Sequence, residues 1–152
     1  MPTTYIDAVD EINKVFWDAW SASSGLVGYV PEVYWQFIEK SQKPDSTKFW
    51  CRFSVKHIYE KQRTISSCET ENGKTMFESS GLVVVSIYGP KSKSNVDTGM
   101  RYLATVARNA FRDKGSKGDV WFKNTRIHEV VPEDLYYKIN VLSDFSYTLI
   151  GG

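Results

Sequence analysis

Two cysteines and two histidines are the residues that could supply a nucleophile, a general base or a zinc ligand: Cys51, Cys68, His57 and His128. A Cys–His pair acts only when both side chains lie within hydrogen-bond reach. Cys51 and His57 share one expected strand, and six steps of about 3.3 Å put them roughly 20 Å apart. The C-x-x-C and H-x-x-x-H spacings of zinc sites do not occur. We therefore interpret these residues as core cysteines and strand histidines.

Phosphate-binding and carboxylate motifs are also missing from the sequence. Neither G-x-x-x-x-G-K-[ST] nor G-x-G-x-x-G occurs, and the glycine cluster Gly115-Ser116-Lys117-Gly118 follows an expected helix. A phosphate cradle needs the opposite order, because the amide groups at a helix N-terminus bind the anion. The acidic residues are scattered, and Glu133-Asp134 after Pro132 is typical of a turn. The sequence thus predicts a protein that is not an enzyme and binds neither cofactor nor metal.

Composition predicts one globular domain over residues 1–152. The chain has 152 residues, 41% of them hydrophobic and 14% aromatic, which suffices for a packed core. Its net charge of +1 argues against a general nucleic-acid binder, which needs a basic surplus. No apolar run approaches the roughly 20 residues of a membrane span, and Met1-Pro2-Thr3-Thr4-Tyr5 does not resemble a secretory signal, so no membrane partner is expected. Two cysteines are too few for a disulfide framework, which favours a reduced, cytosolic setting.

Two helices are expected, one at the N-terminus and one in the middle of the chain. The first begins at a Thr4–Asp7 capping pattern and continues to about Trp20. The second begins at a Ser94–Asp97 pattern, and Gly115 ends it. Apolar residues recur at helical spacing in both. They are Tyr5, Val9, Ile12, Phe16 and Ala19 in the first helix, and Val96, Met100, Leu103, Ala107, Ala110 and Phe111 in the second.

The remaining elements are expected to be strands. A period of two begins at Phe49, and strand-like sequence continues to Glu69 and again over residues 74–88, whose centre Leu82–Val85 is apolar on both faces. Short strands are expected at 119–122 and 126–131, ended by Pro132, and a last strand over 137–147. Residues 26–48 are read as loop with one short strand. The fold class is α+β: a mostly antiparallel sheet with a long β-hairpin, packed against two helices.

The long hairpin predicts a protruding arm. Asn72-Gly73 supplies a two-residue turn, which would place residue 57 opposite residue 88. The outer half, Lys61 to Ser80, is mostly polar, with Ile65, Met76 and Phe77 as its larger apolar residues. A two-stranded ribbon is marginal in water alone. The arm is thus expected either to dock on a neighbouring subunit or to be a loop without a partner.

Two further groups are candidates for a subunit interface. Arg101, Arg108 and Arg112 share one stripe of the second helix, because their spacings are seven and four. The stripe could contact a neighbouring subunit or nucleic acid, or could be a solvated face with an Asp97–Arg101 pair. Trp50 and Trp121 lie on the polar phase of their strands, and this favours an interface over burial within the subunit.

The centre of the chain resembles a known family. The stretch Gly81-Leu82-Val83-Val84-Val85-Ser86-Ile87-Tyr88-Gly89-Pro90 leads into Asp97, Met100, Leu103, Ala104, Val106, Ala110 and Phe111. It is similar to the strand, turn and helix of the tail terminator proteins of long-tailed bacteriophages. Phe16-Trp17-Asp18-Ala19-Trp20 is similar to the family's opening helix, and residues 137–147 to its last strand. The turn Lys91–Asn95 departs from the family because it contains no glycine.

The resemblance implies a structural virion protein that is assembled in the host cytoplasm. Such terminators form a ring, usually a hexamer, that caps the head-proximal end of the tail tube and joins it to the head-completion or connector protein. DNA passes through the ring without specific binding. Two alternatives remain: another tail component, such as a tail tube or head–tail connector protein, or a small binding module.

Overall fold

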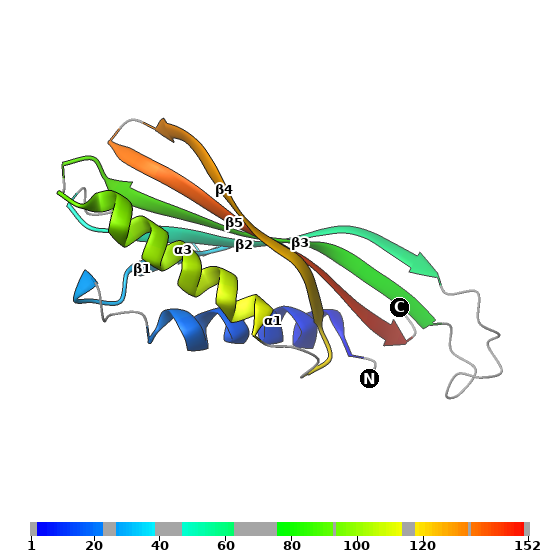
Figure 1. Cartoon of the computed structure of the whole chain (residues 1–152). Coiled ribbons are helices and arrows are strands. Elements are labelled where there is room, and N and C mark those ends of the chain that lie inside the picture. The colour runs from blue at the N-terminus through cyan, green and yellow to red at the C-terminus, as the bar shows by residue number, and fades with distance from the viewer. Residues whose placement is uncertain are drawn as a thin grey trace.

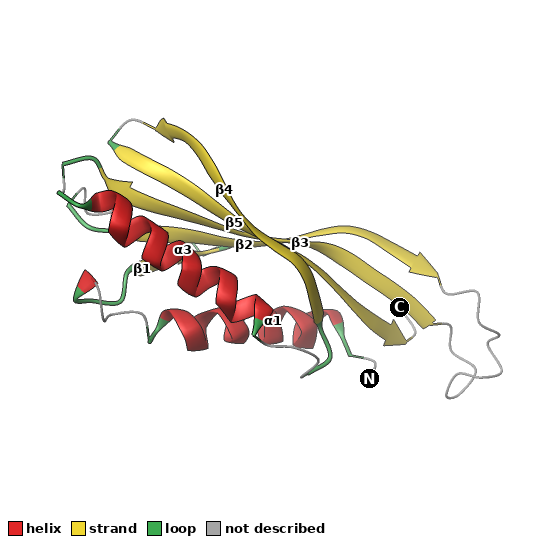
Figure 2. Cartoon of the chain, viewed as in Figure 1, coloured by secondary structure: helices red, strands yellow, loops and turns green. Residues whose placement is uncertain are grey.

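A five-stranded sheet with two helices on one face makes up the computed structural model of this chain (Figure 1). The structure describes residues 3–22, 27–38, 47–62, 76–92, 94–113, 118–133 and 135–150. The elements in chain order are α1 (Tyr5–Trp20), β1 (Glu32–Trp35), β2 (Trp50–Gln62), β3 (Met76–Pro90), α3 (Val96–Arg112), β4 (Trp121–Glu133) and β5 (Tyr136–Ile150). The strand order is β1-β2-β3-β5-β4, and only β1 and β2 pair in parallel. The expected α+β class is confirmed, as is a short strand within residues 26–48 (Figure 2).

Helix α1 begins as its sequence predicts. The Thr4 hydroxyl accepts a hydrogen bond of 3.1 Å from the Asp7 N–H, which satisfies one of the free amides of the first turn. The buried stripe consists of Ala8, Ile12, Phe16 and Trp20. This stripe is rotated from the expected face, because Tyr5 remains 55% exposed.

A side chain of α1 also binds the backbone at the start of β4. Both carboxylate oxygens of Glu11 accept backbone hydrogen bonds, from Asp119 at 2.9 Å and from Val120 at 3.0 Å. The neighbouring Gly118 has a φ of +81°, and a Cβ there would lie 2.6 Å from a Glu11 oxygen. A glycine therefore lets the chain turn into β4 directly beneath the helix.

Helix α3 begins at a different residue from the expected one. The residue before the helix is Asn95, whose φ of 57° is left-handed, and its side chain makes no capping bond, so the Ser94–Asp97 start was wrong. Asparagine tolerates this conformation better than most residues, and it lets the chain reverse directly into the helix. The buried residues agree with the expected apolar stripe. They are Gly99, Met100, Leu103, Ala104, Ala107 and Phe111.

The β2–β3 ladder has a different register from the one expected. Trp50 pairs with Tyr88 and His57 with Gly81, so the predicted pairing of residue 57 with residue 88 was wrong. The observed register puts the apolar phases of both strands on the helix side, and a shift by an odd number of residues would reverse that. The ladder is described as far as Gln62 opposite Phe77, and Asn72-Gly73 lies outside the described residues.

A bulge between His57 and Tyr59 lies beside Gly81 in this ladder. A Cβ at residue 81 would lie 2.0 Å from the Lys56 carbonyl oxygen and 2.9 Å from the His57 Cα. Two backbones approach each other here, and only glycine leaves room for them.

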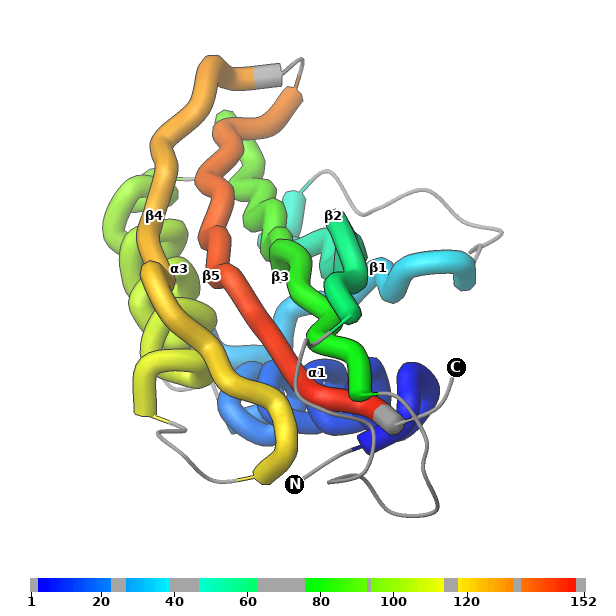
Figure 3. The backbone as a smooth tube through the Cα atoms, turned by 90° about the vertical axis from the view of Figure 1, so that its right-hand side faces the viewer, coloured from blue at the N-terminus to red at the C-terminus, as the bar shows by residue number. Residues whose placement is uncertain are grey.

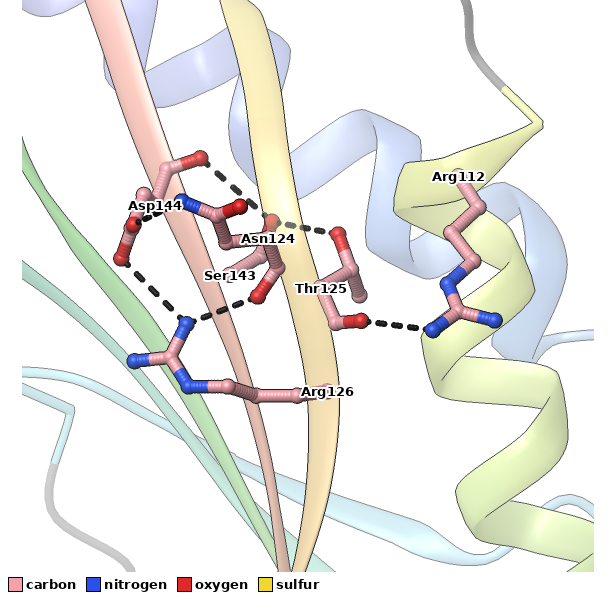
Figure 4. Close-up of polar contacts among 6 residues, drawn as sticks. All are labelled: Arg112, Asn124, Thr125, Arg126, Ser143 and Asp144. Atoms are coloured by element: carbon pink, nitrogen blue, oxygen red, sulfur yellow. Dashed lines mark hydrogen bonds and ion pairs between the residues drawn. The ribbon is translucent and has the colours of Figure 1, made fainter.

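Strand β4 is continuous where two short strands were expected. The pairing with β5 is interrupted between Lys123 and Arg126, and Asn124 there has a φ of 55°. Thr125 is nevertheless buried, and its hydroxyl lies 2.8 Å from that of Ser143 (Figure 4). Pro132 does not end the strand, because β4 is at the sheet edge and a missing N–H there breaks no ladder bond.

The core lies between the sheet and the two helices. Phe16 stacks on Phe53 at 4.6 Å between ring centroids, and Trp35 meets the same ring edge-on at 5.3 Å. The Trp20 indole donates a hydrogen bond of 2.9 Å to the Pro31 carbonyl, so its polar atom is satisfied in the core. Val83, Val85 and Ile87 of β3 and Ile139, Val141 and Phe145 of β5 complete the sheet side of this core.

Candidate subunit interfaces

The arginine stripe of α3 contacts the protein's own β4. Arg101 lies 3.5 Å from both Asp97 and Glu129, and Arg112 donates a hydrogen bond of 2.8 Å to the Thr125 carbonyl (Figure 4). The i,i+4 pair with Asp97 considered from the sequence is therefore present. Arg108 donates a hydrogen bond of 3.4 Å to the side-chain oxygen of Asn109 next to it. Exposed ion pairs of this kind contribute little stability, so Arg101 can exchange its partners for those of a neighbour.

Trp50 is buried within the subunit, contrary to the expectation of an interface. Only 6% of it is exposed, and it stacks on Tyr88 at 4.1 Å with an interplanar angle of 9°. Tyr34 and Tyr136 meet it edge-on at 5.1 and 5.5 Å. The sequence suggested exposure because Trp50 alternates with core residues, but pairing with Tyr88 encloses it on the second face.

Two cationic side chains and a tyrosine hydroxyl with a raised pKa border this aromatic cluster. Arg52 lies over the Trp50 ring at 5.5 Å and Lys138 over the Tyr88 ring at 5.4 Å. Burial, together with a hydrogen bond to Glu32, raises the pKa of Tyr34 to about 12, so its hydroxyl stays protonated at neutral pH. Trp121, by contrast, is 55% exposed and remains an interface candidate.

The second face of the sheet carries no helix in the described part of the chain. Leu82 and Val84 of β3 and Leu142 of β5 form its centre, and all three are half-buried by their sheet neighbours. The apolar residues Leu82–Val85 predicted cover on both sides of the sheet, by helices or by another subunit. In the described part of the subunit, α1 and α3 cover one side (Figure 1). This leaves the second face for a neighbouring subunit, which stays a prediction.

The apolar residues assigned to the arm divide between the sheet and the segment beyond it. Phe77 pairs with Leu149 and packs against the core, while Met76 at the start of β3 is half-buried. Ile65 lies outside the described residues. Phe77 therefore belongs to the folded domain and not to a protruding arm.

A groove between α1 and the β1 edge was not predicted. It is open to solvent, has a volume of about 1010 Å³, and is mostly apolar. Its main apolar residues are Ile6, Val9, Trp17, Trp35, Phe37 and Ile38. Ile6 and Trp17 are apolar residues outside the buried stripe of α1, and this was the one indication of the groove in the sequence. The other wall follows β1, in a region whose sequence has no regular period.

His57 lies at the floor of this groove. Its Nε2 is 2.7 Å from the Tyr147 hydroxyl, and Tyr5 and Phe145 meet the ring edge-on at 4.9 and 5.1 Å. Burial lowers the pKa of His57, because the charged ring would lose its hydration, and burial raises the pKa of Tyr147. His57 is thus a neutral ring that joins β2 to β5.

Acidification should weaken the fold through His57. The unfolded chain binds a proton near the ordinary pKa of about 6.5, whereas the folded protein binds it only at lower pH. Stability from this group is therefore complete above about pH 6.5 and is lost as the pH falls toward the folded-state pKa. Urea unfolding of the wild-type protein and of His57→Gln at several pH values measures how this contribution to the free energy of unfolding depends on pH. The exposed His128→Gln is the control, and an unchanged pH slope in His57→Gln would contradict the assignment.

No chemical centre emerges from the described residues. They contain no group of three or more His, Cys, Asp or Glu side chains placed to hold a metal ion. Cys51 is buried beneath the helices, and its expected role as a core residue is confirmed. Among the described helices, none has the length and apolarity that a bilayer crossing requires.

Comparison with known proteins identifies the fold alone. No protein-family model matches the chain, and no curated protein matches it. One solved structure, of a protein whose name states no function, is similar with a TM-score of 0.59 and 14% sequence identity. The match covers 91% of this chain and 94% of that one. The whole described arrangement of sheet and helices is therefore shared with another protein at low sequence identity.

Proposed function

We propose that this chain is a structural virion protein, a bacteriophage tail terminator. It caps the head-proximal end of the tail tube as a ring and joins the tube to the head-completion protein. The observation that carries the proposal is the unit of β3 and α3, on which the family resemblance rests. Gly89 packs so closely under α3 that a Cβ there would lie 2.7 Å from the Met100 side chain. Strand β3 and helix α3 thus pack directly against each other, which supports the proposal.

The exposed surface supports assembly rather than chemistry. Among the described residues, one sheet face has an apolar centre that no helix covers, and a large apolar groove opens beside α1. Surfaces of this kind mark protein interfaces. The net charge of +1 suits a ring through which DNA passes, because a strongly basic lining would bind the phosphates.

Negative-stain electron microscopy of the purified protein tests this proposal against its alternatives. Closed rings of about six subunits support a terminator. Long tubes would instead identify a tail tube protein, and a protein that stays monomeric at every concentration would favour a small binding module.

A further inference from the structure

Most of the large apolar side chains that are exposed in the described residues lie on two opposite edges of the molecule. One set flanks the groove along α1, β1 and the outer edge of β2: Tyr5, Ile6, Trp17, Phe37, Ile38 and Ile58. The other follows β4 and the turn into β5: Trp121, Val131, Leu135 and Tyr137. Figure 3 looks along the strands and shows β1 and β4 on opposite sides of the sheet. A subunit with two different exposed apolar edges is suited to head-to-tail contact. Such contacts close into a ring when the rotation between successive subunits permits it.

The two longest segments outside the described residues are mostly polar in sequence. Residues 39–46, which follow the groove residue Ile38, read Glu-Lys-Ser-Gln-Lys-Pro-Asp-Ser. Residues 63–75 contain Ile65 as their one large aliphatic residue. Neither sequence offers the apolar side chains that would cover Ile6, Trp17 and Phe37, which favours an occupant from another molecule.

The distribution of charge indicates which molecule occupies the groove. Lys14 and Lys56 line the groove against Asp10, and Lys14 also lies 3.2 Å from Asp18. The segment that joins β4 to β5 carries Glu133 and Asp134 between Val131 and Leu135 in the sequence. The groove and this segment of one chain are thus complementary in sign, which favours contact between copies and directs its orientation.

We propose that the groove of one subunit receives the β4–β5 turn of a second copy, with Val131 and Leu135 as the inserted side chains. Val131, near the end of β4, is 82% exposed, and Leu135, just before β5, is 62% exposed. A backbone hydrogen bond of 3.0 Å from the Lys91 N–H to the Leu135 carbonyl holds Leu135 in place. Little conformational entropy of this residue is therefore lost when it docks. The inference rests on the proposed ring and names the surfaces that close it.

Two single variants and their mixture test this contact. Ile6→Asp places a charge in the groove, and Leu135→Asp places one on the inserted turn. Both side chains are largely exposed in the subunit, so thermal melting should stay close to wild type. Tyr59→Asp is the matched control, because Tyr59 is an exposed aromatic residue that belongs to neither edge and does not line the groove. Native mass spectrometry reads the assembly at a concentration where the wild-type ring is complete.

Each of the two interface variants should remain monomeric, whereas Tyr59→Asp should form the wild-type ring. An equal mixture of Ile6→Asp and Leu135→Asp should give dimers that contain one of each chain, because one intact groove can still receive one intact turn. Rings from both single variants, or a mixture that stays monomeric, would overturn the contact while the terminator proposal stands. A wild-type protein that forms no ring at any concentration would overturn both.

Discussion

Replacing Phe53 with alanine should lower the free energy of unfolding by about 3–5 kcal/mol. Phe53 is 2% exposed and sits between the rings of Phe16 and Trp35, so its removal leaves a cavity that three elements border. For a domain of this size the loss corresponds to a melting temperature lower by roughly 6–20 °C. Urea unfolding and thermal melting both measure it.

The control for this variant is Trp121→Ala. It removes a larger aromatic side chain, but one that is 55% exposed at the edge of the sheet. The free energy of unfolding should change by less than about 0.5 kcal/mol. Equal losses for the two variants would mean that the core does not lie between α1 and β2.

Shortening residues 66–75 to a tight turn should abolish function without destabilising the domain. The described β2–β3 ladder reaches Gln62 and Phe77 and does not depend on the segment beyond them. The core is elsewhere, so the melting temperature should stay within about 2 °C of wild type, as for a surface change. Tails assembled with the shortened protein should be irregular in length or fail to join heads, because we expect the arm to contact a neighbouring subunit or the tube.

Tail length distributions in electron micrographs and the fraction of tails attached to heads are the measurements. A matched variant keeps the segment's length and replaces Ile65 alone with serine. It separates the effect of the apolar Ile65 contact from the effect of the segment's length. Normal tails with attached heads in the shortened variant would mean that residues 66–75 are only a loop.

The parts of the fold that the sequence predicts are those with a clean period. The helical spacing up to Phe16 and Trp20 marked α1, and the spacing from Met100 to Phe111 marked α3. The alternation from Ile139 to Tyr147 marked β5, whose odd-numbered residues face the helices. In each case one face is buried by the subunit's own core, so burial leaves a regular trace in the sequence.

The errors arise where geometry depends on a distant partner. Asn72-Gly73 is a strong local turn signal, but the register of β2 on β3 is set by which residues face the helices, and it places His57 opposite Gly81. Trp50 looked exposed from its own strand, but Tyr34, Tyr88 and Tyr136 from three other strands enclose it. The arginine stripe was placed correctly on α3, but its contacts with Glu129 and Thr125 required knowledge that β4 lies beside that helix.

The groove was missed for the same reason. Its residues come from α1, β1 and the middle of β2, and a single sequence gives no means of bringing these segments together. Phe37, which has a φ of 65° and lies almost fully exposed at the groove rim, follows β1 in a region without periodicity. A large aromatic residue in that conformation, left in solvent, is suited to contact with another molecule.

The central claim is that copies of this chain cap one end of a tail tube. Purified tail tubes incubated with the protein and viewed by cryo-electron microscopy test it most directly. The proposal predicts one closed ring of about six subunits at one end of each tube, and no further tube growth when tube protein is added. Protein bound along the tube sides, at neither end, or incorporated into lengthening tubes would contradict it.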